Sequence, residues 1–175
     1  MQIEFNSNEE STNDLYDRKY LQKICPSTLV DSLKASHWRY QNVVLPKIEQ
    51  SFIGLIKMFP ETPSLVVIFK VFIKFEIALN FHISLEEEII FKEYLLQNES
   101  KNSRNDISHE EEEPFISEII YLIKKEKYVG NPFCRILIQQ LEKFDKELKN
   151  HAWIEENIVY KKIRDLDVKS ARTKK

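Results

Sequence analysis

The histidines of the chain are the residues whose types and spacing point most directly to chemistry. Two of them begin the same pattern, because His82 and His151 are each followed four positions later by a glutamate, Glu86 and Glu155. Residues four apart lie one turn apart on the same face of a helix, so each imidazole and its carboxylate can approach one point. Imidazole and carboxylate side chains are common metal ligands, and this spacing therefore raises the hypothesis of a metal site.

Both His–Glu pairs lie on the apolar stripe of the helical segment that carries them, and we expect them inside the protein. The two stripes contain Phe75, Leu79, His82, Glu86 and Ile90 in one segment and Phe144, Leu148, His151, Glu155 and Ile158 in the other. A buried carboxylate is unfavourable unless it is paired or bound to a metal. Two such carboxylates and four histidines in one bundle predict a bound cation. The adjacent Glu87 and Glu156 are expected to be solvated.

The alternative interpretation is a set of ordinary core residues. One histidine on an apolar face is usually a hydrogen-bonded core residue, and one His-x-x-x-Glu pattern is common. Two copies, with His37 and His109 each on one of the remaining helical segments, favour metal binding over that alternative. Imidazole with carboxylate suits iron better than calcium, which prefers oxygen ligands. Because the set lacks cysteine, thiolate ligation of zinc or of an iron–sulfur cluster is disfavoured.

The composition predicts an all-α protein around these residues. The chain has 175 residues, enough for one domain with a full core, but only two glycines. Tight turns between strands and phosphate-binding loops both need glycine, which argues against all-β, Rossmann and P-loop folds. Cys25 and Cys134 form neither a disulfide framework nor a zinc-finger spacing. A net charge of −2 argues against nucleic-acid binding.

Prolines and polar clusters divide the chain into four long segments with helical periodicity. They cover about residues 27–58, 64–98, 108–128 and 132–165. Pro46 lies inside the first segment and predicts either a kink there or a helix that restarts at Leu45. Four long helices with three connections predict an up-down-up-down four-helix bundle.

The ends of the chain differ from this central region. We expect residues 25–168 to form the bundle, residues 1–24 a flexible, partly disordered N-terminal arm, and residues 169–175 a basic tail. The first residues show no secretory signal pattern. Charged residues interrupt the most apolar stretch, residues 65–81, so it is not expected to span a bilayer. These features predict a cytoplasmic protein that binds neither membrane nor nucleic acid.

Each histidine lies in a longer motif. These motifs are Leu-Val-Asp-Ser-Leu-Lys-Ala-Ser-His at 29–37 with Tyr40 and Leu45-Pro46, His-Ile-Ser-Leu-Glu-Glu at 82–87 with Phe91, His-Glu-Glu-Glu from position 109, and Leu-Glu-Lys-Phe-Asp-Lys-Glu-Leu at 141–148 with His-Ala-Trp-Ile-Glu at 151–155 and Asn157. Over about residues 25–165 they resemble the hemerythrin-like (HHE cation-binding) proteins, specifically the repair-of-iron-centres family. The fourth motif is the most specific.

The resemblance implies a non-haem di-iron centre in a hemerythrin-like four-helix bundle. Its metal ligands would be His37, His82, Glu86, His109, His151 and Glu155, with the two glutamates bridging the ions and no catalytic residue beyond the ligands. An oxo or hydroxo bridge would complete the set and leave open positions for nitric oxide or dioxygen. The chain offers no fifth histidine, which oxygen-carrying hemerythrins have, and no N-terminal cysteine-pair domain, which the repair-of-iron-centres proteins often carry.

The resemblance also implies a function in stress response. Proteins of this family repair iron–sulfur clusters after nitrosative or oxidative damage, by iron donation or nitric oxide reduction, so damaged iron–sulfur proteins are the expected partners. Whether the chain is an enzyme that reduces nitric oxide stays open. One alternative is a hemerythrin-like binding protein that senses or stores dioxygen, nitric oxide or iron without catalysis. Another is a helical interaction bundle without metal.

Overall fold

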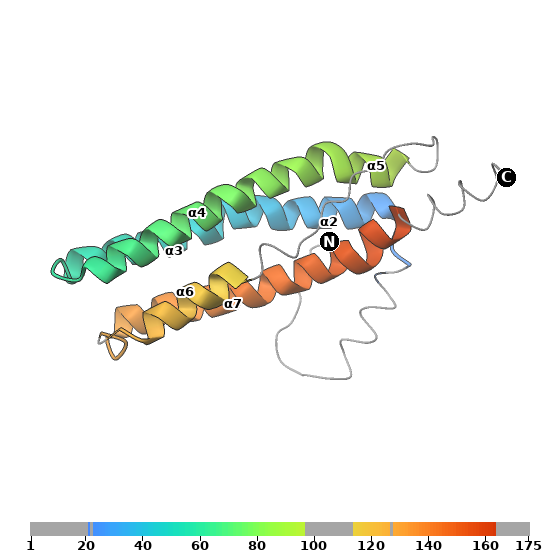
Figure 1. Ribbon diagram of the computed structural model, residues 1–175. Helices are drawn as coiled ribbons and strands as arrows, with labels where there is room; N and C mark the ends of the chain where they lie inside the picture. Colours follow the sequence, from blue (N-terminus) through green and yellow to red (C-terminus); the bar gives the residue numbers. More distant parts are fainter. Residues whose placement is uncertain (1–20, 22, 97–113, 127, 164–175) are drawn as a thin grey trace, which may run out of the picture.

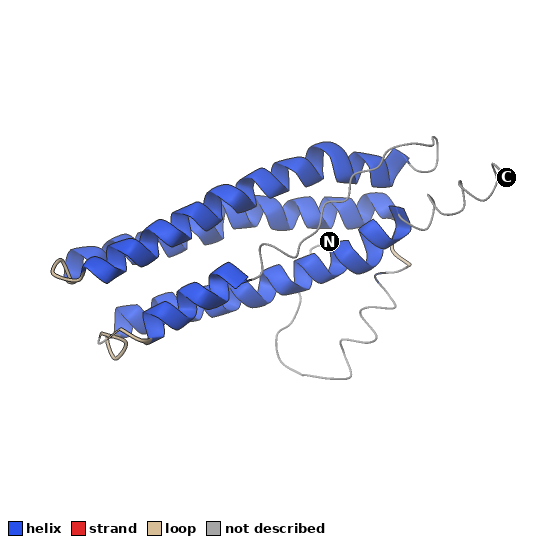
Figure 2. Ribbon diagram, viewed as in Figure 1, coloured by secondary structure: helices blue, strands red, loops and turns tan. Residues whose placement is uncertain are grey.

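The computed structural model describes residues 21, 23–96, 114–126 and 128–163 of the chain. Within these ranges the secondary structure is helical and contains no strand, which confirms the prediction of an all-α protein (Figure 2). Nearly all of the predicted N-terminal arm, the whole basic tail and His109 lie outside the described residues.

The described residues form four helical stretches, in agreement with the number predicted (Figure 1). In chain order they consist of α2 (Pro26–Arg39), the π-helical segment η1 (Tyr40–Val44) and α3 (Leu45–Met58); α4 (Pro63–Leu85), the π-helical segment η2 (Glu86–Ile90) and α5 (Phe91–Leu96); α6 (Pro114–Lys124); and α7 (Pro132–Ile154) with the π-helical segment η4 (Glu155–Tyr160).

Proline begins each of these four stretches. Pro26, Pro63, Pro114 and Pro132 are the first residues of α2, α4, α6 and α7. The first turn of a helix leaves its N–H groups without helical partners, so the missing N–H of proline is harmless there and its fixed φ suits the helix. At α7 the side chain of Asn131 also accepts a hydrogen bond from the backbone N–H of Phe133, at 2.9 Å.

The first stretch changes its geometry just before Pro46. The π-helical segment η1 precedes α3, which begins at Leu45 and has Pro46 in its first turn. Proline cannot donate the hydrogen bond that would continue a regular α-helix, so the preceding turn widens. The prediction that the helix restarts at Leu45 is confirmed.

The helices pack side by side, and this arrangement is compatible with a four-helix bundle. Helices α3 and α4 contact each other, as do α6 and α7, and across these pairs α4 packs on α6 and α3 on α7. The turn between α3 and α4 and the turn between α6 and α7 lie at the same end of the structure (Figure 1). Among the described residues, no helix has both the length and the apolar character needed to cross a bilayer.

The core consists of two apolar clusters. The larger one lies toward the two turns and takes its α4 and α7 residues from positions up to Ile83 and Phe144. The smaller one, which includes Phe91 and Ile158, packs α2 and α5 against η4. The predicted ligands His82, Glu86, His151 and Glu155 come at the boundary between these clusters along both helices, so a polar layer interrupts the core.

Candidate metal centre

Five of the six predicted ligands lie in the described part of the chain, and all five are buried. The side chains with the least exposed surface are His37 at 1%, Glu86 at 0% and Glu155 at 1% of their accessible area. Charged and polar side chains are rarely buried to this degree unless they are paired or bind a metal.

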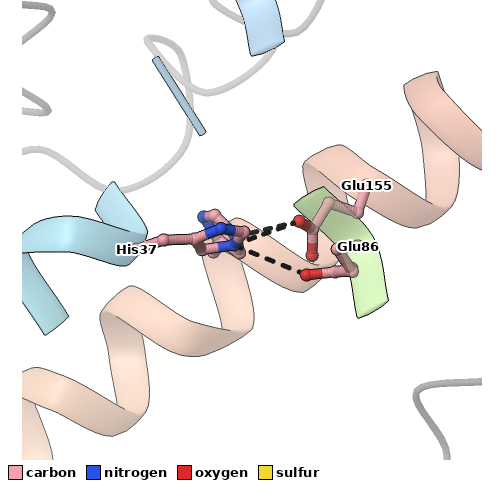
Figure 3. Close-up of side chains that lie close together, drawn as sticks. His37, Glu86 and Glu155 are labelled. Carbon is pink, nitrogen blue, oxygen red and sulfur yellow. Dashed lines mark hydrogen bonds and ion pairs between the residues drawn. The ribbon is translucent and has the colours of Figure 1, made fainter. Parts of the chain in front are cut away.

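Four of these residues converge on one point. One ligand atom from each of His37, Glu86, His151 and Glu155 lies within 4.8 Å of all the others. The Nε2 atoms of the two histidines are 2.8 Å apart, and His151 Nε2 lies 2.9 Å from Glu155 Oε1. Figure 3 shows the imidazole of His37 facing the carboxylates of Glu86 and Glu155, at 3.4 Å and 3.7 Å. Two nitrogen and two oxygen donors from three helical stretches therefore meet, and this cluster can hold a metal ion.

The carboxylate of Glu86 faces two different histidines. Its Oε2 is 3.4 Å from His37 Nε2, whereas its Oε1 is 3.2 Å from His82 Nε2. His82 is thus placed against its predicted glutamate partner, but it contacts a different oxygen of that carboxylate from the one that faces His37. A carboxylate whose two oxygens face different histidines has the disposition that a bridging ligand needs.

The π-helical segments begin at the two glutamates. Glu86 is the first residue of η2 and Glu155 the first residue of η4, while His37 precedes η1 by one turn. A π-turn contains one residue more than an α-turn, and such turns are frequent at functional sites. The wider turn carries the residue five positions after each glutamate back to the site.

Phe91 and Tyr160 are the residues brought back in this way. The Phe91 ring stacks on the His37 imidazole with a centroid distance of 5.6 Å and an interplanar angle of 8°. The Tyr160 hydroxyl donates a hydrogen bond of 2.9 Å to Glu86 Oε1. The spacing of the histidines and glutamates did not predict the role of Tyr160. The signal that could have found it is the equal interval from Glu86 to Phe91 and from Glu155 to Tyr160.

Glu87, which was expected to be solvated, is partly exposed and also contacts a ligand candidate. Its side chain is 34% exposed, and its Oε1 lies 3.0 Å from His37 Nδ1. A histidine that ligates a metal usually donates its second ring N–H to a carboxylate or carbonyl, which fixes the tautomer and the orientation of the ring. An Nδ1–H of His37 donating to Glu87 leaves the Nε2 lone pair directed at the cluster.

Burial shapes the electrostatics of the metal-free site. Burial and the nearby Glu86 carboxylate raise the pKa of Glu155 to about 8. Burial also lowers the pKa of His151 to about 4, so this imidazole stays neutral and keeps a lone pair at physiological pH. For Glu86, burial acts to raise the pKa, but the hydrogen bond and positive charge of His82 outweigh it and lower the pKa. Burial raises the pKa of Tyr160, so its phenol stays protonated and remains a donor.

These directions describe a site that favours a cation. Two carboxylates lie close together in a poorly hydrated interior, and Glu155 retains a proton near neutral pH because burial and the Glu86 charge outweigh the opposing effects of His37 and His82. A bound metal ion would replace that proton and neutralise both carboxylates. The donor set therefore fits a divalent or trivalent cation.

A cavity of about 50 Å³ adjoins the cluster. The five buried ligand candidates line it. Its lining also contains several apolar side chains, together with the half-buried Asp145 and the exposed Lys149, whose Oδ2 and Nζ atoms are 2.8 Å apart. A water-sized probe needs about 10–15 Å³, so the space accepts a molecule of a few atoms beside the donor atoms.

The sequence-predicted site residues thus fall into three groups. His37, Glu86, His151 and Glu155 come together, His82 contacts Glu86 at the edge of that cluster, and His109 lies outside the described residues. The capacity for metal binding rests on this geometry and donor set. In comparisons of the chain with protein-family models, with curated proteins and with solved structures, no match is found.

Proposed function

We propose that the chain is a hemerythrin-like non-haem di-iron protein of the repair-of-iron-centres type, with an up-down-up-down bundle around the metal centre. Its proposed role is the repair of iron–sulfur clusters damaged by nitrosative or oxidative stress. The observation that carries this proposal is the buried convergence of His37, His151, Glu86 and Glu155, with ligand atoms within 4.8 Å of one another.

A centre for two ions is supported by the contacts of Glu86, whose two carboxylate oxygens face different histidines. His37 and His151 would hold one ion, with Glu86 Oε2, and His82 would hold the other, with Glu86 Oε1. Glu155, which contacts His151 at 2.9 Å, would be the second carboxylate of the pair. The resemblance adds His109, which lies outside the described residues, as the fourth histidine of the set.

Iron is the metal that this donor set suits best among those that the protein could use for redox chemistry. Mixed imidazole and carboxylate ligation without thiolate is typical of non-haem iron. Bound there, a pair of iron ions would supply electrons and an open coordination position. The chain itself holds the ions, keeps His151 neutral as a ligand, and fixes His37 through Glu87.

The cavity beside the cluster supports the proposal that a small molecule binds next to the metal ions. Its apolar lining includes Phe75, Leu79 and Ile83, and its volume of about 50 Å³ admits molecules of a few atoms. An apolar wall favours uncharged species, so nitric oxide and dioxygen are the candidates consistent with the cavity. Charged or larger metabolites would be poorly accommodated beside the ligands.

The experiment that tests the proposal combines metal analysis with two activity assays. Anaerobically reconstituted protein is expected to hold two irons per chain, to consume nitric oxide under anaerobic conditions, and to reactivate an iron–sulfur enzyme previously damaged by nitric oxide. Protein that takes up no iron would refute the metal centre. Protein that binds two irons but neither consumes nitric oxide nor reactivates the enzyme would instead be a sensor or store.

A further inference from the structure

The two helical stretches that carry the His–Glu pairs present the same series of residues at the same intervals. The matched residues are Phe75 and Phe144, Leu79 and Leu148, His82 and His151, Glu86 and Glu155, and Phe91 and Tyr160. Both series change from α-helix to π-helix at the glutamate. The rings of Phe75 and Phe144 meet edge to face at a centroid distance of 6.3 Å. The metal centre is thus built from two matched halves.

The last matched position breaks this equivalence. Phe91 offers only a ring, which stacks on His37, whereas Tyr160 offers a hydroxyl group. That hydroxyl crosses from η4 to the other helix and donates to Glu86 Oε1 at 2.9 Å, with both side chains buried. The oxygen that accepts this bond is the one that faces His82 Nε2, at 3.2 Å, and not the one that faces His37.

We propose that Tyr160 is a positioning residue that makes the two metal positions unequal by fixing the Glu86 oxygen on the His82 side. This inference rests on the proposed di-iron function, and in it Tyr160 is the residue that makes the surroundings of the two ions different. A hydrogen bond between a hydroxyl and a carboxylate is among the stronger ones in a buried site. It restrains rotation of the Glu86 carboxylate about its terminal bond, and so keeps Oε1 directed toward the ion that His82 would hold.

The consequence is a selective contribution to metal binding. Removing an outer partner of a metal ligand typically lowers metal affinity about 10- to 100-fold. Because Tyr160 touches Glu86 Oε1, the loss falls on the ion at His82. The ion held by His37 and His151 keeps Glu86 Oε2, and His37 keeps its own partner Glu87. A phenylalanine at this position is compatible with the fold, since the matched position is Phe91.

The test is an anaerobic titration of the metal-free full-length chain with Co²⁺, followed by its visible absorption and by competition with a chelator. We expect two binding steps in the wild-type protein. Tyr160→Phe is expected to weaken one step about 10- to 100-fold, to change the absorption bands of that step, and to leave the other step in place. Tyr94→Phe is the matched control, because Tyr94 is buried in the same apolar cluster and its ring faces Lys162.

The outcomes separate this inference from the proposed function. Two wild-type steps that Tyr160→Phe leaves unchanged would overturn the role of Tyr160 while the metal centre stands. An equal weakening of both steps, or the same change in Tyr94→Phe, would also overturn it, because the effect would then be one of general stability. A wild-type chain that binds no Co²⁺ and no iron would refute the proposed function itself, and this inference with it.

Discussion

At the scale of single residues, local spacing predicted some contacts of the site and missed others. Both i, i+4 pairs form as expected, because their geometry depends on one helix alone: His82 contacts Glu86, and His151 contacts Glu155. The contact between Glu87 and His37 joins two helices and depends on their relative rotation, which no local pattern contains. The sequence therefore indicated which residues share a helix face but not which faces meet.

The amount of iron lost when a glutamate is replaced is expected to depend on where that glutamate lies relative to the site. Glu86→Ala and Glu155→Ala remove buried ligands and are expected to lose most of the bound iron. Glu87→Ala removes only the partner of His37 Nδ1 and is expected to weaken iron binding about 10-fold, less than either ligand substitution. Glu156→Ala should retain the most iron. The number of irons per chain after desalting ranks the four variants. Equal losses from all four would contradict the assignment of Glu86 and Glu155, rather than Glu87 and Glu156, as ligands.

The pH dependence of the metal-free protein is expected to reveal the buried Glu155 carboxyl. In the unfolded chain this group releases its proton near its ordinary pKa of 4.5, but in the folded protein only near 8. The free energy of unfolding that Glu155 contributes is therefore fully present below pH 4.5 and is lost as the pH rises through 8. Glu155→Gln should show no such loss.

The measurement compares urea unfolding of metal-free wild-type protein and Glu155→Gln from pH 5 to pH 9. The advantage of the variant should grow across this window by more than about 1.4 kcal/mol, the equivalent of one pKa unit. A difference that stays constant with pH would show that Glu155 is hydrated in the metal-free protein.

At the scale of secondary-structure elements, prolines predicted where α2, α4 and α7 begin, whereas the start predicted for the third segment, residue 108, lies outside the described residues. Pro46 predicted a kink or a restart at Leu45, and α3 begins at Leu45. The π-helical segments η2 and η4 were not predicted, because no proline or glycine marks them. Their effect is visible in the residues that η4 buries. A regular helix places Ile158 and Val159 on the stripe after Glu155, and the structure buries both. The wider turn brings Tyr160, five positions after Glu155, to the buried side as well.

Deletion of one residue is expected to distinguish a π-turn from an α-turn. Asn157 lies exposed in η4, so its deletion should convert the π-turn to an α-turn while the residues on both sides keep their faces. Deletion of Lys143, which is exposed in α7, should rotate His151 and Glu155 by about 100° away from the core. We expect the first variant to unfold cooperatively within a few degrees of the wild type and the second to lose its cooperative transition.

Circular dichroism during heating provides the comparison, with both variants in the metal-free form. Equal damage from the two deletions would mean that η4 tolerates no change in residue number. In that case the π-turn would be required by the packing of Val159 and Tyr160 rather than by the position of Glu155.

At the scale of the whole molecule, the glycine-poor composition and four periodic segments were sufficient to predict an all-α protein. The packing of α4 on α6 and of α3 on α7 was not contained in the periodicity, which marks an apolar face without naming its neighbour. The result is a core in two clusters with a polar layer between them. This layer places carboxylates and imidazoles where a hydrophobic layer would stabilise the bundle more, so its presence in the core favours a functional role.

Metal removal is expected to destabilise the whole bundle. An ion bound only by the native state stabilises it by mass action, and it also offsets the charge that Glu86 and Glu155 bring into the interior. Iron-loaded protein should therefore melt at a clearly higher temperature than metal-free protein in differential scanning calorimetry. Coincident melting curves for the two forms would contradict a native-state metal site.

The double variant Glu86→Gln, Glu155→Gln separates the two causes of that destabilisation. Glutamine keeps the shape of each side chain but removes its ionisable group, so this variant should bind little iron and yet melt above the metal-free wild type. The gain should be larger at pH 9 than at pH 5, because Glu155 of the wild type is protonated at the lower pH and mostly ionised above its pKa of about 8. If the variant melts no higher than the metal-free wild type at either pH, buried carboxylate charge is not what weakens the bundle. The cation would then stabilise the bundle only by linking the helices that carry its ligands, and not by neutralising buried charge.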